Sequence, residues 1–119
     1  MRARRVLIVE DEFLVAMMLE EVVRGAGHEV VGPALDIASA RSLARDAAFD
    51  AAVLDVNLGG DLTFEVAGIL GARSLPYFLV TGYGLDGVPD AYRQMPVLQK
   101  PFREQDLLRL LAEALADRR

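Results

Sequence analysis

A short apolar run that ends in an acid constrains this chain most strongly. Residues 51–54 are all apolar, Asp55 follows them, and Gly59 and Gly60 come shortly afterwards. Because the run is too short for a typical helix, it predicts a central parallel strand that is covered on both faces. An ionised carboxylate is costly in such a place without compensation. We therefore expect Asp55 to lie at the open end of the strand and to have a cationic partner.

Composition limits the class of protein. The 119 residues predict one domain, and 53% hydrophobic with 26% charged residues is typical of a folded globular chain. No apolar run approaches the ~20 residues of a membrane span, and the segment after the basic start is too short for a signal peptide. The net charge of −5 gives no electrostatic reason to expect nucleic acid. We expect a cytoplasmic domain with neither nucleic-acid nor membrane partners.

Other apolar runs predict four more strands that alternate with helices. We expect strands at 6–9, 29–32, 75–80 and 97–99, and helices at 13–26 and 103–116. Two further helices are expected after Asp36 and after Asp61, with these acids as their N-caps. Met17 and Met18 are expected in the core, and residues 83–94 are expected to form a loop with one short helix. The alternation predicts a three-layer α/β sandwich with a flavodoxin-like, five-stranded parallel sheet of order 2-1-3-4-5.

Polar residues follow four of the five predicted strands. Glu10 and Asp11 follow the first strand, Asp55 ends the third, and Thr81 and Lys100 follow the fourth and fifth. The carboxyl ends of parallel strands meet at one edge of the sheet, which is where sites form in such folds. Crowded carboxylates raise one another's pKa, and a hard divalent cation removes this conflict. Oxygen ligands of this kind predict Mg²⁺.

These groups suit phosphoryl transfer to a carboxylate. Ionised Asp55 beside a metal is a competent oxygen nucleophile, and the metal neutralises the charge of the arriving phosphoryl group. Thr81 can donate a hydrogen bond to one phosphoryl oxygen, and Lys100 can pair with another. Zinc is disfavoured because the chain has no cysteine and because His28 is far from these strand ends. The set predicts a phosphoaspartate site.

Four short motifs resemble the signatures of the response-regulator receiver domain, also called CheY-like. They are Val-Glu-Asp-Glu at 9–12, Leu-Asp-Val-Asn at 54–57, Val-Thr-Gly at 80–82 and Lys-Pro-Phe at 100–102. The resemblance covers the whole chain and implies one receiver domain over 1–119, with no effector domain. It implies that Asp55 is phosphorylated by a sensor histidine kinase or a histidine phosphotransfer protein. The chain would then catalyse only its own phosphotransfer and autodephosphorylation.

The resemblance also implies roles for single residues and partners. The implied Mg²⁺ ligands are Glu10 (through water), Asp11, Asp55 and Asn57 (backbone carbonyl). Thr81 and Lys100 would close on the phosphate, and the bond between Lys100 and Pro101 would be cis. The surface around the last two strands and their helices would switch and control a downstream protein partner or relay phosphate. A homodimer is compatible with this family.

Two positions depart from the family pattern. Receivers usually carry a proline four residues after the acceptor and an aromatic residue three before the lysine, where this chain has Gly59 and Val97. Residues 76–83 resemble a subgroup with a Phe-Ala-Thr-Gly-Tyr-like motif, often stand-alone receivers. We therefore predict that Tyr83 and the loop after it form the mobile switch in place of an aromatic at Val97.

Three other functions stay open from the sequence. A phosphatase of the haloacid-dehalogenase type would need a second acid where Asn57 stands. A flavodoxin would need a neutral phosphate loop after the first strand, where Glu10, Asp11 and Glu12 would repel a phosphate. A degenerate receiver would bind partners without phosphorylation, although its acceptor, threonine and lysine are intact. For Glu12 alone, the sequence favours a plain acidic first turn of a helix.

Overall fold

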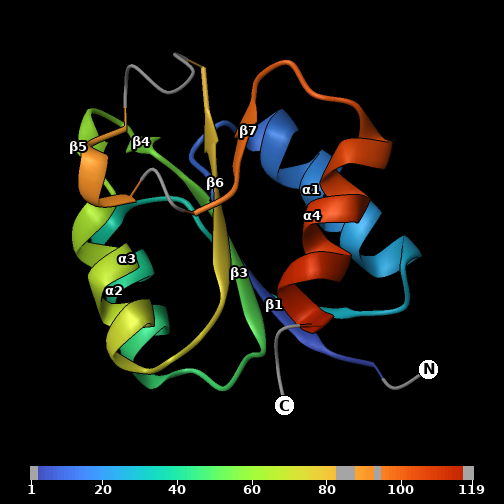
Figure 1. Ribbon diagram of the computed structural model, residues 1–119, viewed down its shortest axis with the longest axis horizontal. Coiled ribbons are helices and arrows are strands. Elements are labelled where there is room, and N and C mark those ends of the chain that lie inside the picture. Colours follow the sequence, from blue (N-terminus) through green and yellow to red (C-terminus); the bar gives the residue numbers. More distant parts are fainter. Residues whose placement is uncertain (1–2, 83–87, 93–94, 117–119) are drawn as a thin grey trace.

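The computed structural model describes residues 3–82, 88–92 and 95–116 as three layers, with the sheet in the middle (Figure 1). The sheet consists of β1 (Arg5–Val9), β2 (Glu29–Ala34), β3 (Ala51–Asp55), β6 (Tyr77–Thr81) and β7 (Val97–Gln99). All neighbouring strands are parallel, in the order β2-β1-β3-β6-β7. Counted along the chain, this is the predicted order 2-1-3-4-5. The predicted fold class is therefore confirmed.

Four α-helices cover the two faces of this sheet. They are α1 (Phe13–Gly25), α2 (Ile37–Asp46), α3 (Phe64–Ala72) and α4 (Glu104–Ala116). Figure 1 shows α2 and α3 on one face and α1 and α4 on the other. A 3₁₀ helix, η2 (Asp90–Tyr92), lies between β6 and β7. It agrees with the predicted short helix, whereas Tyr83 lies outside the described residues.

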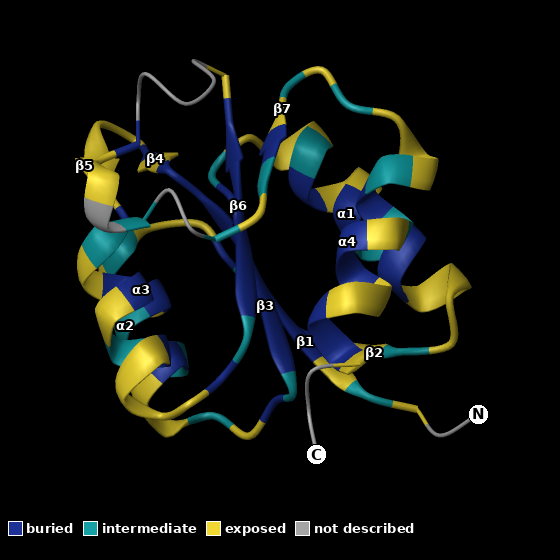
Figure 2. Cartoon of the chain, in the orientation of Figure 1, coloured by how far each residue is buried: buried dark blue, intermediate teal, exposed yellow. Residues whose placement is uncertain are grey.

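The central strands β1, β3 and β6 are buried on both faces, as Figure 2 shows, whereas the edge strands β2 and β7 are only partly buried. Successive side chains of a strand point to opposite faces, so β1 contributes to two separate cores. Leu7 and Val9 pack in the core beneath α2 and α3, and Val6 and Ile8 pack in the core beneath α1 and α4. A continuous apolar run is thus required wherever helices cover both faces. The site lies just beyond the ends of these runs.

Of the two predicted acidic helix caps, one is confirmed and one is wrong. Asp36 caps α2, because its Oδ1 accepts a hydrogen bond from the backbone N–H of Ser39 at 2.8 Å. Asp61 caps nothing, because it belongs to a hairpin of β4 (Asn57–Leu58) and β5 (Asp61–Leu62). The turn between them is Gly59-Gly60, with positive φ angles of 60° and 95°. Such a pair favours a two-residue hairpin turn, which delays the start of α3 to Phe64.

The predicted burial of Met17 and Met18 is wrong. Their exposed fractions are 46% and 39%, and Phe13 and Leu14 are still more exposed, at 65% and 79%. The buried stripe of α1 consists of Ala16, Leu19, Val22 and Val23. The first half of this helix is apolar on every side, so its sequence does not determine which side faces the core. Among the described residues, no helix has the length and apolar character needed to cross a bilayer.

Candidate phosphoacceptor site

The predicted strand-end residues meet at one cavity. The carboxyl ends of β3, β6 and β7 are joined in register, and the backbone N–H of Lys100 donates to the carbonyl of Thr81 at 2.8 Å. A cavity of about 380 Å³ opens there, lined by Asp11, Glu12, Asp55, Asn57, Gly59, Gly60, Thr81, Gly82 and Lys100. Glu10 is fully buried behind this lining. The structure thus brings together all of the predicted site residues from β1, β3, β6 and β7.

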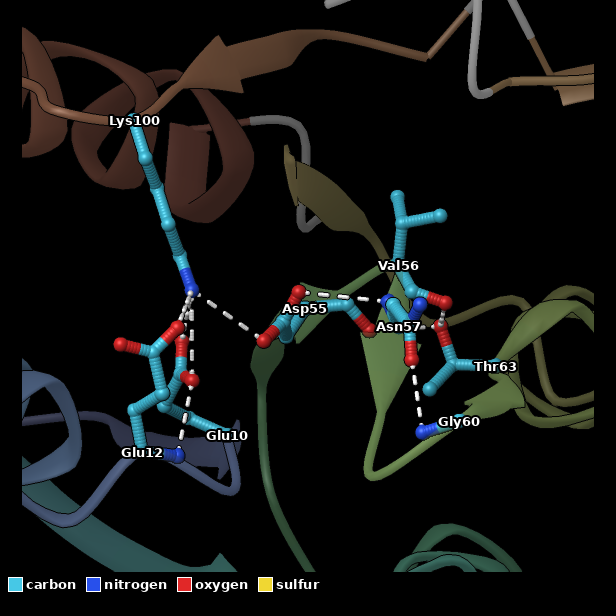
Figure 3. Close-up of polar contacts among 8 residues, drawn as sticks. All are labelled: Glu10, Glu12, Asp55, Val56, Asn57, Gly60, Thr63 and Lys100. Atoms are coloured by element: carbon cyan, nitrogen blue, oxygen red, sulfur yellow. Dashed lines mark hydrogen bonds and ion pairs between the residues drawn. The ribbon is translucent and has the colours of Figure 1, made fainter. Parts of the chain in front are cut away.

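Lys100 is the cationic partner that Asp55 was expected to have. Its Nζ lies 3.2 Å from Oδ2 of Asp55 and 3.0 Å from Oε1 of Glu10. A third carboxylate, that of Glu12, also lies 3.2 Å from the same nitrogen. Figure 3 shows the three acids converging on the end of this side chain. Burial alone would lower the pKa of Lys100, but the hydrogen bond that Lys100 donates to Glu10 and the charges of Asp55 and Glu10 outweigh it and raise that pKa.

Glu10 carries the clearest electrostatic cost of this crowding. Burial raises its pKa from 4.5 to about 7, and its hydrogen bond with Asp55 and the charge of Asp55 act in the same direction. Two hydrogen bonds to Glu10 oppose this shift in pKa. One comes from the backbone N–H of Glu12, which donates to Oε2 at 3.1 Å, and the other comes from Lys100. Burial and the neighbouring Asp55 thus favour the protonated form of Glu10.

This shift predicts how stability depends on pH. Between pH 4.5 and about 7 the folded protein retains a proton on Glu10 that the unfolded chain has released. The contribution of Glu10 to the free energy of unfolding is then largest below pH 4.5 and falls as pH rises through about 7. The quantity to measure is the free energy of unfolding of the wild-type protein minus that of the Glu10→Gln variant, with a chelator present to remove metal ions. We expect this difference to fall as pH rises from 4.5 to about 7. Urea titrations at several pH values measure the difference, and a flat one would contradict the assignment.

The acidic cluster has the features of a hard-cation site. Glu10, Asp11 and Asp55 each offer an oxygen, and these three atoms lie within 4.8 Å of one another. Oε1 of Glu10 is buried and forms an ion pair with Nζ of Lys100 at 3.0 Å, but it accepts no aligned hydrogen bond among the described residues. This carboxylate oxygen therefore has lone pairs left that a cation could use. Carboxylate oxygens in this number suit Mg²⁺. The residues present therefore fit the predicted ion.

Thr63 is a site residue that the sequence analysis missed. Its hydroxyl is fully buried and donates to the backbone carbonyl of Asp55 at 2.7 Å, with the carbonyl of Val56 at 3.3 Å. On the other side, the backbone N–H of Asn57 donates to Oδ1 of Asp55 at 3.2 Å. The hydroxyl thus fixes the backbone at the acceptor. A signal was available, because Thr63 is a good N-cap type that directly follows a Gly-Gly hairpin.

Replacing Thr63 with valine tests this anchor. The shape is kept, but the carbonyl of Asp55 loses its buried donor. We expect the free energy of unfolding to fall by about 1–3 kcal/mol. Urea denaturation measures the change. Thr63→Ser, which keeps the hydroxyl, is the matched control and should lose less than the valine variant. Equal losses in the two variants would contradict a role for the hydrogen bond.

The positions that depart from the family pattern have structural explanations. Gly59 has a φ of 60°, which proline cannot adopt, and a Cβ there would lie 3.6 Å from Oδ2 of Asp11. The hairpin therefore replaces the usual proline turn. Val97 is half-buried and packs against the core beneath α2 and α3. The bond between Lys100 and Pro101 is cis, as predicted.

Comparisons with known proteins place this arrangement in a family. No protein-family model matches the chain. The solution structure of SdrG from Sphingomonas melonis Fr1 is similar to it, with 42% identity over 95% of this chain and 97% of that one, at a TM-score of 0.84. The signal receiver domain of a modulated diguanylate cyclase from Desulfovibrio desulfuricans G20 is 30% identical over 97% and 95% of the two chains, at a TM-score of 0.83. The chain belongs to the response-regulator receiver family.

Curated relatives agree with this assignment and set its scope. The transcriptional regulatory protein PdtaR from Mycobacterium tuberculosis is 36% identical over 112 residues, which are 88% of this chain and 53% of PdtaR. The response regulator protein FleR from Pseudomonas aeruginosa is 36% identical over 92% of this chain and 24% of FleR. The chain thus spans about half or less of the curated relatives that it matches. The shared part is the receiver domain of two-component response regulators.

Proposed function

We propose that this receiver is a phosphoacceptor and that Asp55 takes a phosphoryl group from a phosphohistidine. The observation that carries the proposal is the contact of Asp55 with Lys100 at 3.2 Å in a cavity that Thr81 also lines. In that cavity a nucleophile, a cation and a hydroxyl surround a space of about 380 Å³. These are the groups that phosphoryl transfer needs.

The residues divide the chemistry between them. An Oδ atom of Asp55 attacks phosphorus, the new O–P bond forms as the N–P bond of the donor breaks, and the donor nitrogen leaves with the electron pair. Lys100 balances charge on the phosphoryl oxygens, and Thr81 donates a hydrogen bond to one of them. Hydrolysis later transfers the phosphoryl group to water and restores the carboxylate. The chain thereby acts on itself and turns over no separate substrate.

Mg²⁺ is the ion that we propose for the acidic cluster. Asp11 and Asp55 would hold it with the backbone carbonyl of Asn57, and Glu10 would help through water. The ion would neutralise the charge that the phosphoryl group brings to an already acidic pocket. A receiver domain of the sensor histidine kinase PA1611 from P. aeruginosa, which has this fold at 22% identity, has magnesium coordinated in its active-site cleft.

We propose protein partners on both sides of the reaction. The donor would be a sensor histidine kinase or a histidine phosphotransfer protein, and the output would be contact with a downstream protein. The anti-anti-sigma factor PhyR from Bartonella quintana is similar to this chain, with 27% identity over 97% of this chain and 49% of that one. The exposed apolar residues of α1 begin at Phe13, the residue that follows the cavity-lining Glu12 in the chain, and they favour a protein ligand. Residues 1–119 would form one receiver domain that works in the cytoplasm. A homodimer is compatible with this proposal, and nucleic acid is not an expected partner.

Mapping of the modified residue tests the proposal. The protein is incubated with phosphoramidate, an N–P donor, and Mg²⁺, and an acyl phosphate is then reduced with borohydride and located by peptide mass. We expect the reduction product at position 55 alone. Modification at other acids such as Asp50 or Asp61, or at none, would contradict the proposal, and the absence of any product would favour a degenerate receiver.

A further inference from the structure

Glu12 is a charged residue of the cavity to which the proposed reaction gives no role. The sequence favoured a plain first-turn acid, but the structure contradicts this, because Glu12 is the N-cap residue of α1 and its side chain caps no backbone N–H. The carboxylate instead reaches Nζ of Lys100 at 3.2 Å and lines the cavity. It does not belong to the cluster of three acids that could hold a metal.

The donors of Lys100 are limited in number. An ammonium has three N–H groups, and in this site three acids lie within 3.3 Å of it: Glu10, Glu12 and Asp55. A phosphoryl oxygen can receive a donor from Lys100 only if one of these contacts is given up. The site with a phosphoryl group and the site without one therefore differ in which oxygen atoms accept hydrogen bonds from Lys100.

The three contacts are not equally easy to release. The side chains of Glu10 and Asp55 are 0% and 7% exposed, so water cannot replace the cation there without a large cost. The side chain of Glu12 is 63% exposed, and water can solvate its carboxylate as the contact breaks. The contact with Glu12 is thus the one that an incoming phosphoryl group displaces.

We infer that Glu12 is a positioning residue that holds Lys100 in the empty site and competes with the phosphoryl group for its ammonium. This inference rests on the proposed function. The carboxylate of Glu12 should change the affinity of the site for Mg²⁺ and for the phosphoryl group in opposite directions. It draws Lys100 away from Glu10 and Asp55, which makes the acids more available to Mg²⁺, and it adds a negative charge to the wall of a cavity that receives a dianion.

Glu12→Gln separates these two consequences. Without the carboxylate, Lys100 pairs more closely with Asp55 and Glu10, so Mg²⁺ should bind about threefold more weakly. Once Mg²⁺ is saturating, the phosphoryl analogue beryllofluoride should bind about threefold more tightly, because its competitor is gone. A change in packing or stability alone would weaken both ligands. The matched control is Glu21→Gln, which removes the same charge from an exposed position of α1.

The chain offers a direct probe, because Lys100 is its only lysine. Protein labelled with ¹³C at the lysine ε position gives one side-chain signal, which reports Mg²⁺ alone and then beryllofluoride at saturating Mg²⁺. Opposite shifts of the two affinities in Glu12→Gln, with both unchanged in Glu21→Gln, would support the inference. Unchanged affinities, or affinities that move in the same direction, would overturn it while leaving the proposed function intact. Wild-type protein that bound neither ligand would overturn both.

Discussion

Replacing Lys100 with methionine is expected to lower the free energy of unfolding by about 3 kcal/mol at pH 8 without metal. The ammonium is the cation that lies within 3.3 Å of Glu10, Glu12 and Asp55. Its loss leaves two nearly buried carboxylates facing each other without compensation. The effect should shrink at pH 5, because Glu10 has a raised pKa and takes up a proton there. Mg²⁺ at pH 8 should restore part of the stability by supplying positive charge.

Urea denaturation of wild type and Lys100→Met at pH 5 and pH 8 measures these effects. Arg103→Met, which removes an exposed cation nearby in the chain, is the control and should change stability little. When Lys100→Met is introduced into the Glu10→Gln variant, the free energy of unfolding should fall by much less than in the wild-type protein, because one of the uncompensated acids is then neutral. A loss in the Lys100 variant that was the same at both pH values, and insensitive to Glu10→Gln, would contradict the charge-balance account.

The second large effect concerns the metal. We expect Asp11→Asn to weaken Mg²⁺ binding at least tenfold, because it removes one charged oxygen donor from a cluster of three acids. Mg²⁺ at ten times its wild-type Kd should stabilise the wild-type protein by about 1.4 kcal/mol, and most of this gain should disappear in the variant. Without Mg²⁺, Asp11→Asn should be no less stable than wild type, since a repelling charge has gone.

Thermal unfolding at a series of Mg²⁺ concentrations measures the gain in stability for each protein. Asp46→Asn is the control, because Asp46 is an exposed acid at the far end of α2. It should retain the full response to Mg²⁺. If Asp11→Asn and Asp46→Asn responded to Mg²⁺ alike, the ion would be binding the acidic surface in general and not this cluster.

Much of the fold and site could be predicted because local patterns and topology agree. Apolar runs with polar residues at their ends predict buried parallel strands, and parallel strands bring those ends to one edge. Asp55, Thr81 and Lys100 are far apart in the chain but adjacent for this reason. Thr63 could not be placed in the same way, because its contact depends on a hairpin that moves the start of α3.

Other features depend on side-chain directions that a sequence pattern does not contain. Met17 and Met18 lie on a helix whose first half is apolar all round, so only packing against the sheet selects the buried side. Glu12 turns toward Lys100 because the buried acids hold that ammonium nearby. The expected switch at Tyr83 lies outside the described residues and stays a prediction.

The most direct test of the central claim is the intact mass of the protein after incubation with acetyl phosphate and Mg²⁺. The account predicts one phosphoryl group per chain in the wild-type protein, none in Asp55→Asn, and none when EDTA removes the ion. Asp61→Asn, an exposed acid of the β4–β5 hairpin, should still accept the group. An adduct that survived in Asp55→Asn, or that formed equally well in EDTA, would contradict the claim that Asp55 and a metal-binding acidic cluster form a phosphoacceptor site.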